Sequence, residues 1–563
     1  MRRASDQPRE ERRARRREDD PGILARFRQH MLLRSVSARR FGRYGFLGRV
    51  PTEINVKLGQ PWPGDPKRGL AIAAGDLEFA GERVRDPTLC WSPAAGAEDW
   101  LAAWHGFAWL SDVLAAGSAA REVARKLVQS WLAEEIDSRS VVWRSDVVGT
   151  RLFAWIAHFD EIAGGKDPAL KRAILVSLSK QHRLLSRIAA WEPKGAAALR
   201  ALKGWIAGSV ALGGSGPRLA KALAALERQM SHQIFPDGGH RSRSPSVQLR
   251  VIQDLIDIRT LLRAAKIDPP ATLQNTIERA APMLRLFRHG DRRLALFNDS
   301  FEEDGVLIDL VLTRSETSGR PRSHAPDSGF ERLQAGKSLV IVDTGSRPPP
   351  GFDSHAHAGA LSFEISHDRE RIVVNCGAYR GPKRNLELLP RTSAAHSVLV
   401  VADTNSTEIR DDGILHRAPI SVTCERAEHE GQQWISATHD GYRERFGLIY
   451  TRELFLDADG DDLRGEDRLA GRPGARFAVR FHFHPSIEPS LIQGQTAVAL
   501  RLPSGNCWRL RASGAELSLA ESIYLGSGEV RKTQQVVLSG TAAPGGTTVR
   551  WALRREPNTI GFD

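Results

Sequence analysis

The chain has few cysteines, no long apolar run and no apolar leader, and each of these absences excludes a class of protein. Its four cysteines among 563 residues are widely scattered, without a CxxC pair. Neither a disulfide framework nor a cysteine-based zinc ribbon is therefore expected. No run of 18 apolar residues occurs, so no membrane-spanning helix is expected. The first residues are dense in charge, which predicts a chain without a secretory signal peptide.

Positive charge is in excess, with 80 Lys and Arg against 67 Asp and Glu and a formal charge of +13. Such a balance favours polyanionic partners, namely nucleic acid, anionic lipid or an acidic polysaccharide, although it also serves solubility alone. The basic residues are dispersed and no nucleic-acid-binding module is recognisable. A specific nucleic-acid partner is therefore not expected.

Residues 1–70 form a basic arm that is predicted to be partly disordered, because charge is dense at its start. Within it, Ile23–Val36 carries Leu, Phe and Arg at helical spacing. This stretch is compatible with peripheral contact to an anionic membrane. It is equally compatible with a helix that docks on the body of the protein.

Two patterns divide the rest of the chain. Residues 71–315 carry apolar residues at intervals of three and four, separated by Gly, Pro and Asp clusters, which predicts antiparallel helices in a bundle or toroid. A polar linker rich in Ser, Pro and Arg follows. Residues 325–563 hold short β-branched or alternating runs, typical of an antiparallel sandwich. We expect an α+β multidomain protein, with an (α/α) toroid-like helical domain before an antiparallel β-sandwich.

Two histidines, His355 and His357, lie two residues apart just before an apolar run early in the second domain. On a strand, this spacing places both imidazoles on one face. Because neutral imidazole binds metals and titrates near neutrality, that face would hold a proton-transfer group beside a metal ligand. A lone His-x-His motif is weak evidence, and a structural role fits it equally well.

Six stretches are informative in combination: PDGGHRSRSPSVQLRVIQDLIDIR, LALFNDS, SHAHAGALSFEIS, RIVVNCGAYRGP, RTSAAHSVLVV and HDGYRERFGLIYTRELFLDADGDDLRGEDRL. Together they resemble the motifs of the heparinase II/III-like family of polysaccharide lyases, which act on glycosaminoglycans or alginate. The resemblance covers most of the chain from about residue 80. It implies an (α/α) toroid followed by a β-sandwich, an active cleft between them and a zinc ion in the sandwich near the cleft.

The implied reaction is β-elimination on a uronic acid, which needs a neutralised carboxylate, a base for the C5 proton and an acid for the leaving oxygen. By this resemblance, His355 is the catalytic or carboxylate-neutralising histidine, while His357 and His396 are zinc ligands. Asn375 stands where the family usually has a ligating Asp, and a neutral amide binds zinc less well than a carboxylate. Without a metal, the two zinc-site histidines would hydrogen-bond each other's strands.

The helical half departs from the family pattern. Where family lyases carry a Ser-Pro-x-Tyr-His motif, this chain has Ser-Pro-Ser-Val-Gln over residues 244–248, and no tyrosine occurs between Tyr44 and Tyr379. The family's Asn-His pair, which meets the substrate carboxylate, is also missing. Either the catalytic set has been rebuilt or the activity is lost.

A rebuilt set would draw on four residues. Tyr379 lies between the two zinc-site segments and would serve as acid or base. His240 and Arg241 precede a predicted helix whose N-terminus favours anions, and we take His240 as a catalytic candidate and Arg241 as a substrate contact. Arg391, five residues before His396, would contact substrate or cap a strand.

Two functions follow from these observations. The first is a carbon–oxygen lyase that cleaves an acidic, uronate-containing polysaccharide by β-elimination. The alternative is a catalytically altered family member that binds a charged cell-envelope polysaccharide. The resemblance implies the cell envelope or periplasm as the location, whereas the lack of a signal peptide predicts the cytoplasm.

Overall fold

The computed structural model describes most of the chain beyond the basic arm. The described residues are 50–59, 62–86, 88, 91, 97–134, 140–164, 167–189, 195–213, 216–381, 384–410, 413, 415–416, 419, 421–492 and 494–556. The stretch Ile23–Val36 lies outside them, so its membrane or docking role stays a prediction. None of the described helices combines the length and the apolar character needed to cross a bilayer.

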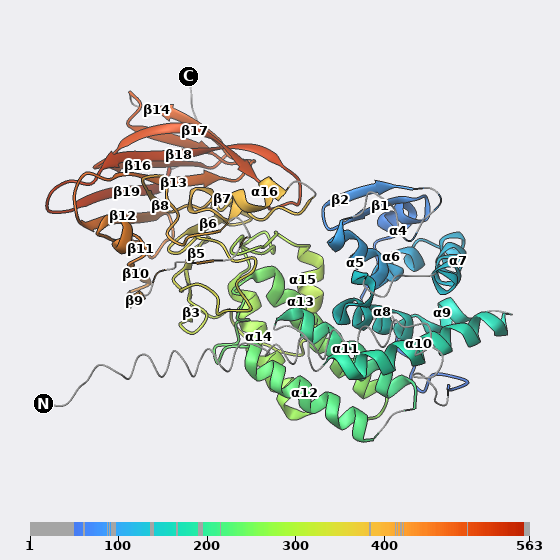
Figure 1. Cartoon of the computed structure of the whole chain (residues 1–563). Coiled ribbons are helices and arrows are strands. Elements are labelled where there is room, and N and C mark those ends of the chain that lie inside the picture. Colours follow the sequence, from blue (N-terminus) through green and yellow to red (C-terminus); the bar gives the residue numbers. More distant parts are fainter. Residues whose placement is uncertain are drawn as a thin grey trace, which may run out of the picture.

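The first half of the chain is helical (Figure 1). Its helices are α4 (Pro66–Ala73), α5 (Glu98–Gly106), α6 (Leu110–Ala115), α7 (Ser118–Ala133), α8 (Ser145–Ala157), α9 (Phe159–Ala163), α10 (Pro168–Ile188), α11 (Ala196–Ala211), α12 (Pro217–Gln233), α13 (Pro245–Ala264), α14 (Ala271–Leu286) and α15 (Gly305–Arg314). A short hairpin of β1 (Asp76–Phe79) and β2 (Glu82–Arg85) interrupts them. The apolar spacing of three and four therefore predicted the element type of this half correctly.

Helix α11 is the centre of the helical half, because it packs against α8, α10, α12 and α13. Its Ala- and Gly-rich sequence allows this close packing. A Cβ at Gly204 of α11 would come within 2.3 Å of the Cα of Gly149 on α8, so neither glycine tolerates a side chain without moving a helix. The N-terminus of α11 lies near the second half of the protein, since a Cβ at Gly195, just before the helix, would be 3.9 Å from the carbonyl oxygen of Gly351.

The second half consists of antiparallel strands. After β3 (His324–Ala325) come β4 (Phe330–Ala335), β5 (Ser338–Asp343), β6 (Phe363–His367), β7 (Glu370–Val374), β8 (Leu399–Val401), β9 (Val422–His429), β10 (Gln432–His439), β11 (Leu448–Leu456), β12 (Asp462–Gly471), β13 (Arg476–Phe483), β14 (Glu488–Ile492), β15 (Ala497–Arg501), β16 (Cys507–Ser513), β17 (Glu516–Tyr524), β18 (Arg531–Thr541) and β19 (Thr547–Glu556). Two short helices, α16 (Arg384–Leu388) and α17 (Arg443–Phe446), lie in its loops.

These strands form two sheets that pack face to face. One sheet has the order β14-β15-β16-β19-β12-β11-β10-β9, and the other has the order β17-β18-β13-β7-β6-β5-β4-β3, with β8 added to β13. Between them, Trp551 stacks on Phe363 at 5.5 Å between ring centroids and meets Phe481 edge-on at 4.9 Å. The alternation of buried and half-buried residues along β11 shows why these sequences form a sandwich.

Buried polar contacts join the two halves. Arg243, in the loop before α13, donates to the carbonyl oxygens of Ser328 and Ser346 at 2.7 and 2.8 Å and pairs with the carboxylate of Asp343. Arg243 is only 6% exposed. A second contact runs from His289 to Glu364 at 3.0 Å, both side chains being fully buried. These bonds fix the helical half against the sandwich and so define the space between them.

Candidate functional site

A cavity of about 940 Å³ lies between the two halves, and we call it the interdomain cleft. Its helical wall comes from the β1–β2 hairpin, the start of α11, the loop before α13 and residues 298–299. Its sandwich wall comes from residues 351–352, 354–355, 357, 378–381, 387 and 391. The halves touch beside the cavity, because a Cβ at Gly81 would overlap the carbonyl oxygen of Arg380.

The charge of the cleft is mixed. Four arginines line it, namely Arg200, Arg250, Arg380 and Arg391. Five carboxylates line it as well, namely Glu82, Glu98, Asp99, Asp299 and Glu387. The overall charge of +13 is therefore not concentrated here, and any anion selectivity depends on individual arginines.

Two predicted catalytic residues, His355 and Tyr379, line the cleft from the sandwich wall. His355 is exposed and Tyr379 is half-buried. Within the described part of the chain, neither side chain makes a hydrogen bond. Both are available to a ligand in the cleft, so they are its candidate proton-transfer groups.

The segment that carries the histidine pair is a loop, and the expectation of a strand with both imidazoles on one face is wrong. Strand β6 begins only at Phe363. The backbone before it is held by other partners: the His357 N–H donates to the side-chain oxygen of Asn298 at 3.0 Å. The Arg391 Nε donates to the carbonyl of Ala356 at 2.9 Å. Since these bonds replace a strand ladder, His355 faces solvent while His357 is buried.

His240 lines the cleft from the helical wall, but the fold already uses both of its ring nitrogens. Its Nδ1 accepts from the Ser242 N–H at 3.1 Å, and its Nε2 donates to the Gln233 side chain at 3.1 Å. The residue is 2% exposed, and burial lowers the pKa of its imidazole to about 3. His240 is therefore a neutral structural group in this arrangement.

His357 and His396 form a chain of hydrogen bonds in which every ring nitrogen is occupied. The Asp299 N–H donates to His357 Nε2 at 3.0 Å, so the His357 proton is on Nδ1 and points to His396 Nε2 at 3.2 Å. His396 Nδ1 donates to the Thr392 carbonyl at 2.7 Å. Burial lowers the pKa of His396 to about 4 and that of His357 well below its ordinary value. Both rings are neutral.

This arrangement does not fit the zinc ion that the sequence resemblance implies. Neither His357 nor His396 keeps a free lone pair, because each acceptor nitrogen already receives a proton. The Asn375 oxygen accepts from the Ser397 N–H at 3.0 Å, and its buried nitrogen, a donor, lacks a partner. In the described part of the chain, no group of three or more His, Cys, Asp or Glu is placed to hold a metal. No step below is routed through zinc.

The two predicted substrate-binding arginines have other contacts. Arg391 lines the cleft, but its Nε and an Nη hold the carbonyls of Ala356 and Gly413 at 2.9 and 2.7 Å. It therefore shapes the loop that presents His355. Arg241 does not line the cleft, and its guanidinium lies 5.2 Å from the ring centre of Phe235. Arg391 thus borders the cleft with part of its guanidinium already bound, whereas Arg241 lies outside the cleft lining.

Sequence reasoning assigned no role to Asn298 and Asp299, which link the helical wall to the histidine loop. Both adopt left-handed backbone conformations, with φ of 41° and 34°, which non-glycine residues rarely do. Asn298 accepts from the His357 N–H and donates to the Arg243 carbonyl. Two sequence signals pointed here: the stretch LALFNDS, which carries part of the family resemblance, and within it the dipeptide Asn-Asp, whose residues tolerate this conformation.

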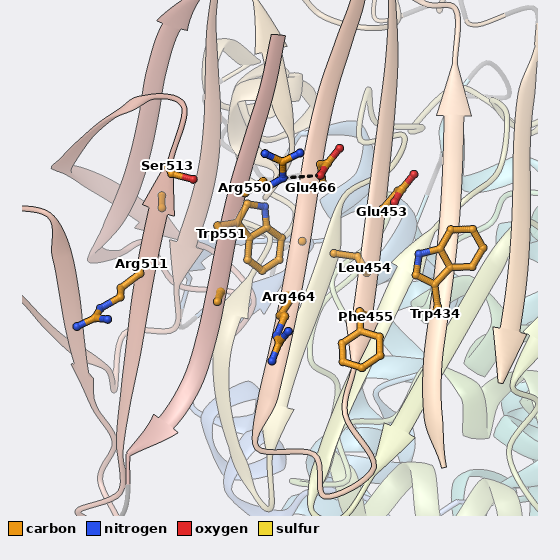
Figure 2. A pocket seen from close by; sticks show the side chains of 13 residues that line it. Trp434, Glu453, Leu454, Phe455, Arg464, Glu466, Arg511, Ser513, Arg550 and Trp551 are labelled. Carbon is orange, nitrogen blue, oxygen red and sulfur yellow. Dashed lines mark hydrogen bonds and ion pairs between the residues drawn. The ribbon is translucent and has the colours of Figure 1, made fainter. Parts of the chain in front are cut away.

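A second hollow, of about 440 Å³, lies on the sheet that contains β10, β11, β12, β16 and β19 (Figure 2). Trp434 and Phe455 are cross-strand partners in it. Several of its charged residues are already paired, as in the Arg550–Glu466 ion pair at 2.9 Å that Figure 2 marks. None of the residues predicted for catalysis lines it, so the interdomain cleft is the better candidate site.

Comparison with known proteins gives a domain family for the second half of the chain and a fold for both halves. A model of the heparinase II/III-like C-terminal domain matches residues 317–552. FtsZ-localized protein C of Caulobacter vibrioides is 28% identical over 540 residues, which cover 90% of this chain and 91% of that protein.

Solved structures are similar over both halves. The crystal structure of heparinase III matches with a TM-score of 0.71 at 13% identity, over 91% of this chain and 88% of that one. A mutant of the heparan sulfate lyase HepC from Pedobacter heparinus matches with a TM-score of 0.62 at 14% identity, over 88% and 83%. At such identities the likeness establishes the fold, a helical region followed by antiparallel sheets.

Proposed function

Because residues 317–552 match the heparinase II/III-like C-terminal domain, we propose that the chain binds an acidic, uronate-containing polysaccharide in the interdomain cleft and cleaves it by β-elimination. The observation that carries this proposal is the availability of two groups. His355 and Tyr379 line the cleft, and neither is hydrogen-bonded within the described part of the chain. His240 and His357, in contrast, have both ring nitrogens occupied.

In the proposed reaction, His355 removes the C5 proton of the uronate. The electron pair of that bond forms the C4–C5 double bond as the C4–O bond breaks, and Tyr379 protonates the departing oxygen. Positioned proton transfer of this kind contributes about 10²–10⁴-fold to a rate. Water then restores the proton of Tyr379 and removes that of His355.

The substrate carboxylate has to be neutralised before C5 becomes acidic. Arg380 is suited to this, since it follows Tyr379 in the chain and lines the cleft. Its guanidinium lies 4.8 Å from the Phe301 ring centre and only 3.5 Å from the Asp299 carboxylate, a loose ion pair. Burial lowers the pKa of Arg380 because it disfavours the charged form, and a carboxylate ligand would stabilise that charge.

The test is an assay of product formation. The protein is incubated with heparin, heparan sulfate, alginate and hyaluronan, and the ultraviolet absorbance of the unsaturated uronate is followed. His355→Ala should lose about 10²–10⁴-fold of the rate. His429→Ala, at a histidine whose side chain is 84% exposed on β9, is the matched control and should keep the rate. Undiminished activity in His355→Ala would refute the assignment.

A second function, binding without cleavage, is favoured by the helical wall. That wall contributes no tyrosine, and both ring nitrogens of its histidine, His240, are hydrogen-bonded. In addition, a relative that matches nine-tenths of the chain bears the name FtsZ-localized protein C. In this alternative, the cleft binds a charged cell-envelope polysaccharide without cleaving it. Saturable binding that Arg380→Gln abolishes, with no ultraviolet product from any of the four polymers, would favour it over the lyase.

A further inference from the structure

A small cavity with strong positive charge lies outside the interdomain cleft, and we call it the arginine pocket. It measures about 430 Å³ and shares no lining residue with the cleft. Four arginines line it: Arg285 from the last turn of α14, Arg288 and Arg292 from the following loop, and Arg332 from β4. It therefore lies where the helical half meets the sandwich.

The arginines outnumber the acids of the pocket. Asp309 on α15 is the one carboxylate in its lining, and it pairs with Arg288 at 2.5 Å and with Arg292 at 3.0 Å. The remaining lining side chain that titrates, His289, is fully buried and is bound to Glu364 and Ser366. Four guanidinium groups therefore face a single carboxylate.

Arg285 and Arg332 have only uncharged partners among the described residues. Arg285 donates to the carbonyl of Thr317 at 2.6 Å, while its Nη1 is buried without a partner. Arg332 donates to the carbonyls of Leu286 and Arg288, both at 2.8 Å, where α14 ends. Two guanidinium groups thus lie at the pocket without a counter-ion.

The lowered pKa values of Arg332 and Arg285 agree with the lack of a counter-ion. Burial, together with the nearby charge of Arg288, lowers the pKa of Arg332 to about 10. The same two causes lower the pKa of Arg285. A bound anion would remove the repulsion between these groups and supply acceptors for the free donors.

We infer that the arginine pocket binds a tetrahedral oxyanion, phosphate or sulfate. The planar guanidinium fork matches two oxygens of such a group at once, and the doubly charged ion offsets the excess of guanidinium groups. The ion is either free in solution or part of a larger molecule, such as a sulfated sugar or a phospholipid headgroup. The arginine pocket is independent of the proposed function, because none of its lining residues lines the interdomain cleft.

The test measures the melting temperature of the full chain during titration with inorganic phosphate and with sulfate, at constant ionic strength set with chloride. Both ions should raise it saturably, and acetate should not. Arg285→Gln and Arg292→Gln should each weaken the apparent affinity at least about tenfold, the loss of one charge-assisted contact. The Arg292 side chain is 63% exposed, so that variant will fold.

Arg279→Gln is the matched control, since Arg279 is an exposed residue of the same helix and does not line the pocket. No saturable shift with either ion, an equal shift with acetate, or wild-type affinity in both pocket variants would overturn the inference. Titration with a heparin oligosaccharide and sedimentation with phosphatidic acid vesicles identify the source of the ion. If the oligosaccharide or the vesicles bind and Arg285→Gln weakens that binding, the ion is part of the larger molecule. If only the inorganic ions bind, the ion is free in solution.

Discussion

The two walls of the interdomain cleft differ in what their polar groups are free to do. On the helical wall, both ring nitrogens of His240 are hydrogen-bonded. Arg243, in the same loop, pairs with Asp343 of the sandwich. On the sandwich wall, His355 and Tyr379 line the cavity without such partners. The helical wall thus shapes the cleft, while the groups that can move a proton come from the sandwich.

Removing one group from each wall tests this difference most directly. Tyr379→Phe keeps the ring and removes only the hydroxyl, so product formation should fall about 10²–10⁴-fold. His240→Gln should leave the rate per folded molecule unchanged, because His240 Nε2 already donates to Gln233. Initial rates in the ultraviolet assay measure both. Equal losses would place a reactive group on the helical wall after all.

The structural task of the helical wall is tested at Arg243. Arg243→Met leaves the Asp343 carboxylate buried and unpaired, and burial already raises the pKa of that group. We expect a loss of about 3–5 kcal/mol in the free energy of unfolding, measured by urea with tryptophan fluorescence. Arg241→Met, which loses only a contact with the Phe235 ring, should cost about 0.5–1 kcal/mol. Similar losses in the two variants would show that Arg243 is not the clamp between the halves.

Sequence patterns predicted the architecture well because both halves follow simple periodicities. The apolar spacing marked the helices before Arg314, and alternating runs marked the strands after His324. The toroidal closure of the helices stays a prediction, since periodicity does not determine how successive helices curve.

The site was harder to predict, because its geometry depends on loops. Alternation along a strand failed at His355 and His357, where side chains from Asn298 and Arg391 hold the backbone. Arg391 is held by two backbone carbonyls that are distant in sequence. His240 is held by nearer residues, but only because the loop before α13 folds back on the end of α12. No local pattern reveals that a polar side chain is already occupied.

Acidity should affect the two halves of the protein alike, because buried histidines occur in both. His182 in α10 and His439 in β10 each have a pKa lowered to about 4 by burial. The unfolded chain takes up these protons below about pH 6.5, and the folded chain does so only near pH 4. Stability is therefore constant above about pH 6.5 and falls as the pH drops, by about 2 kcal/mol per histidine at pH 5.

Unfolding in urea at pH 8 and pH 5 measures this difference. His182→Gln retains the bond to Ser209 and His439→Asn retains the acceptor for the Gly441 N–H. Each variant should remove about 2 kcal/mol of the pH effect. An effect in one half alone would mean that the other half opens to water before it unfolds.

The smallest effects are expected at the junction of the walls, where two neighbouring residues share the same backbone strain. Asn298→Gly and Asp299→Gly both relieve a left-handed conformation, a gain that the greater freedom of glycine in the unfolded chain partly offsets. Asn298→Gly also leaves the buried His357 N–H without its acceptor, at a cost of about 1–3 kcal/mol. That cost exceeds the relief, so this variant should be less stable than the wild type.

Asp299→Gly keeps the backbone N–H that donates to His357 and loses only the loose ion pair with Arg380. A partly exposed pair of this kind contributes about 0.2–1 kcal/mol, which the relieved strain matches. We therefore expect a stability within about 1 kcal/mol of the wild type, measured in the same urea experiment. A large loss at Asp299 together with a small one at Asn298 would mean that the ion pair, and not the side-chain amide, ties the helical wall to the histidine loop.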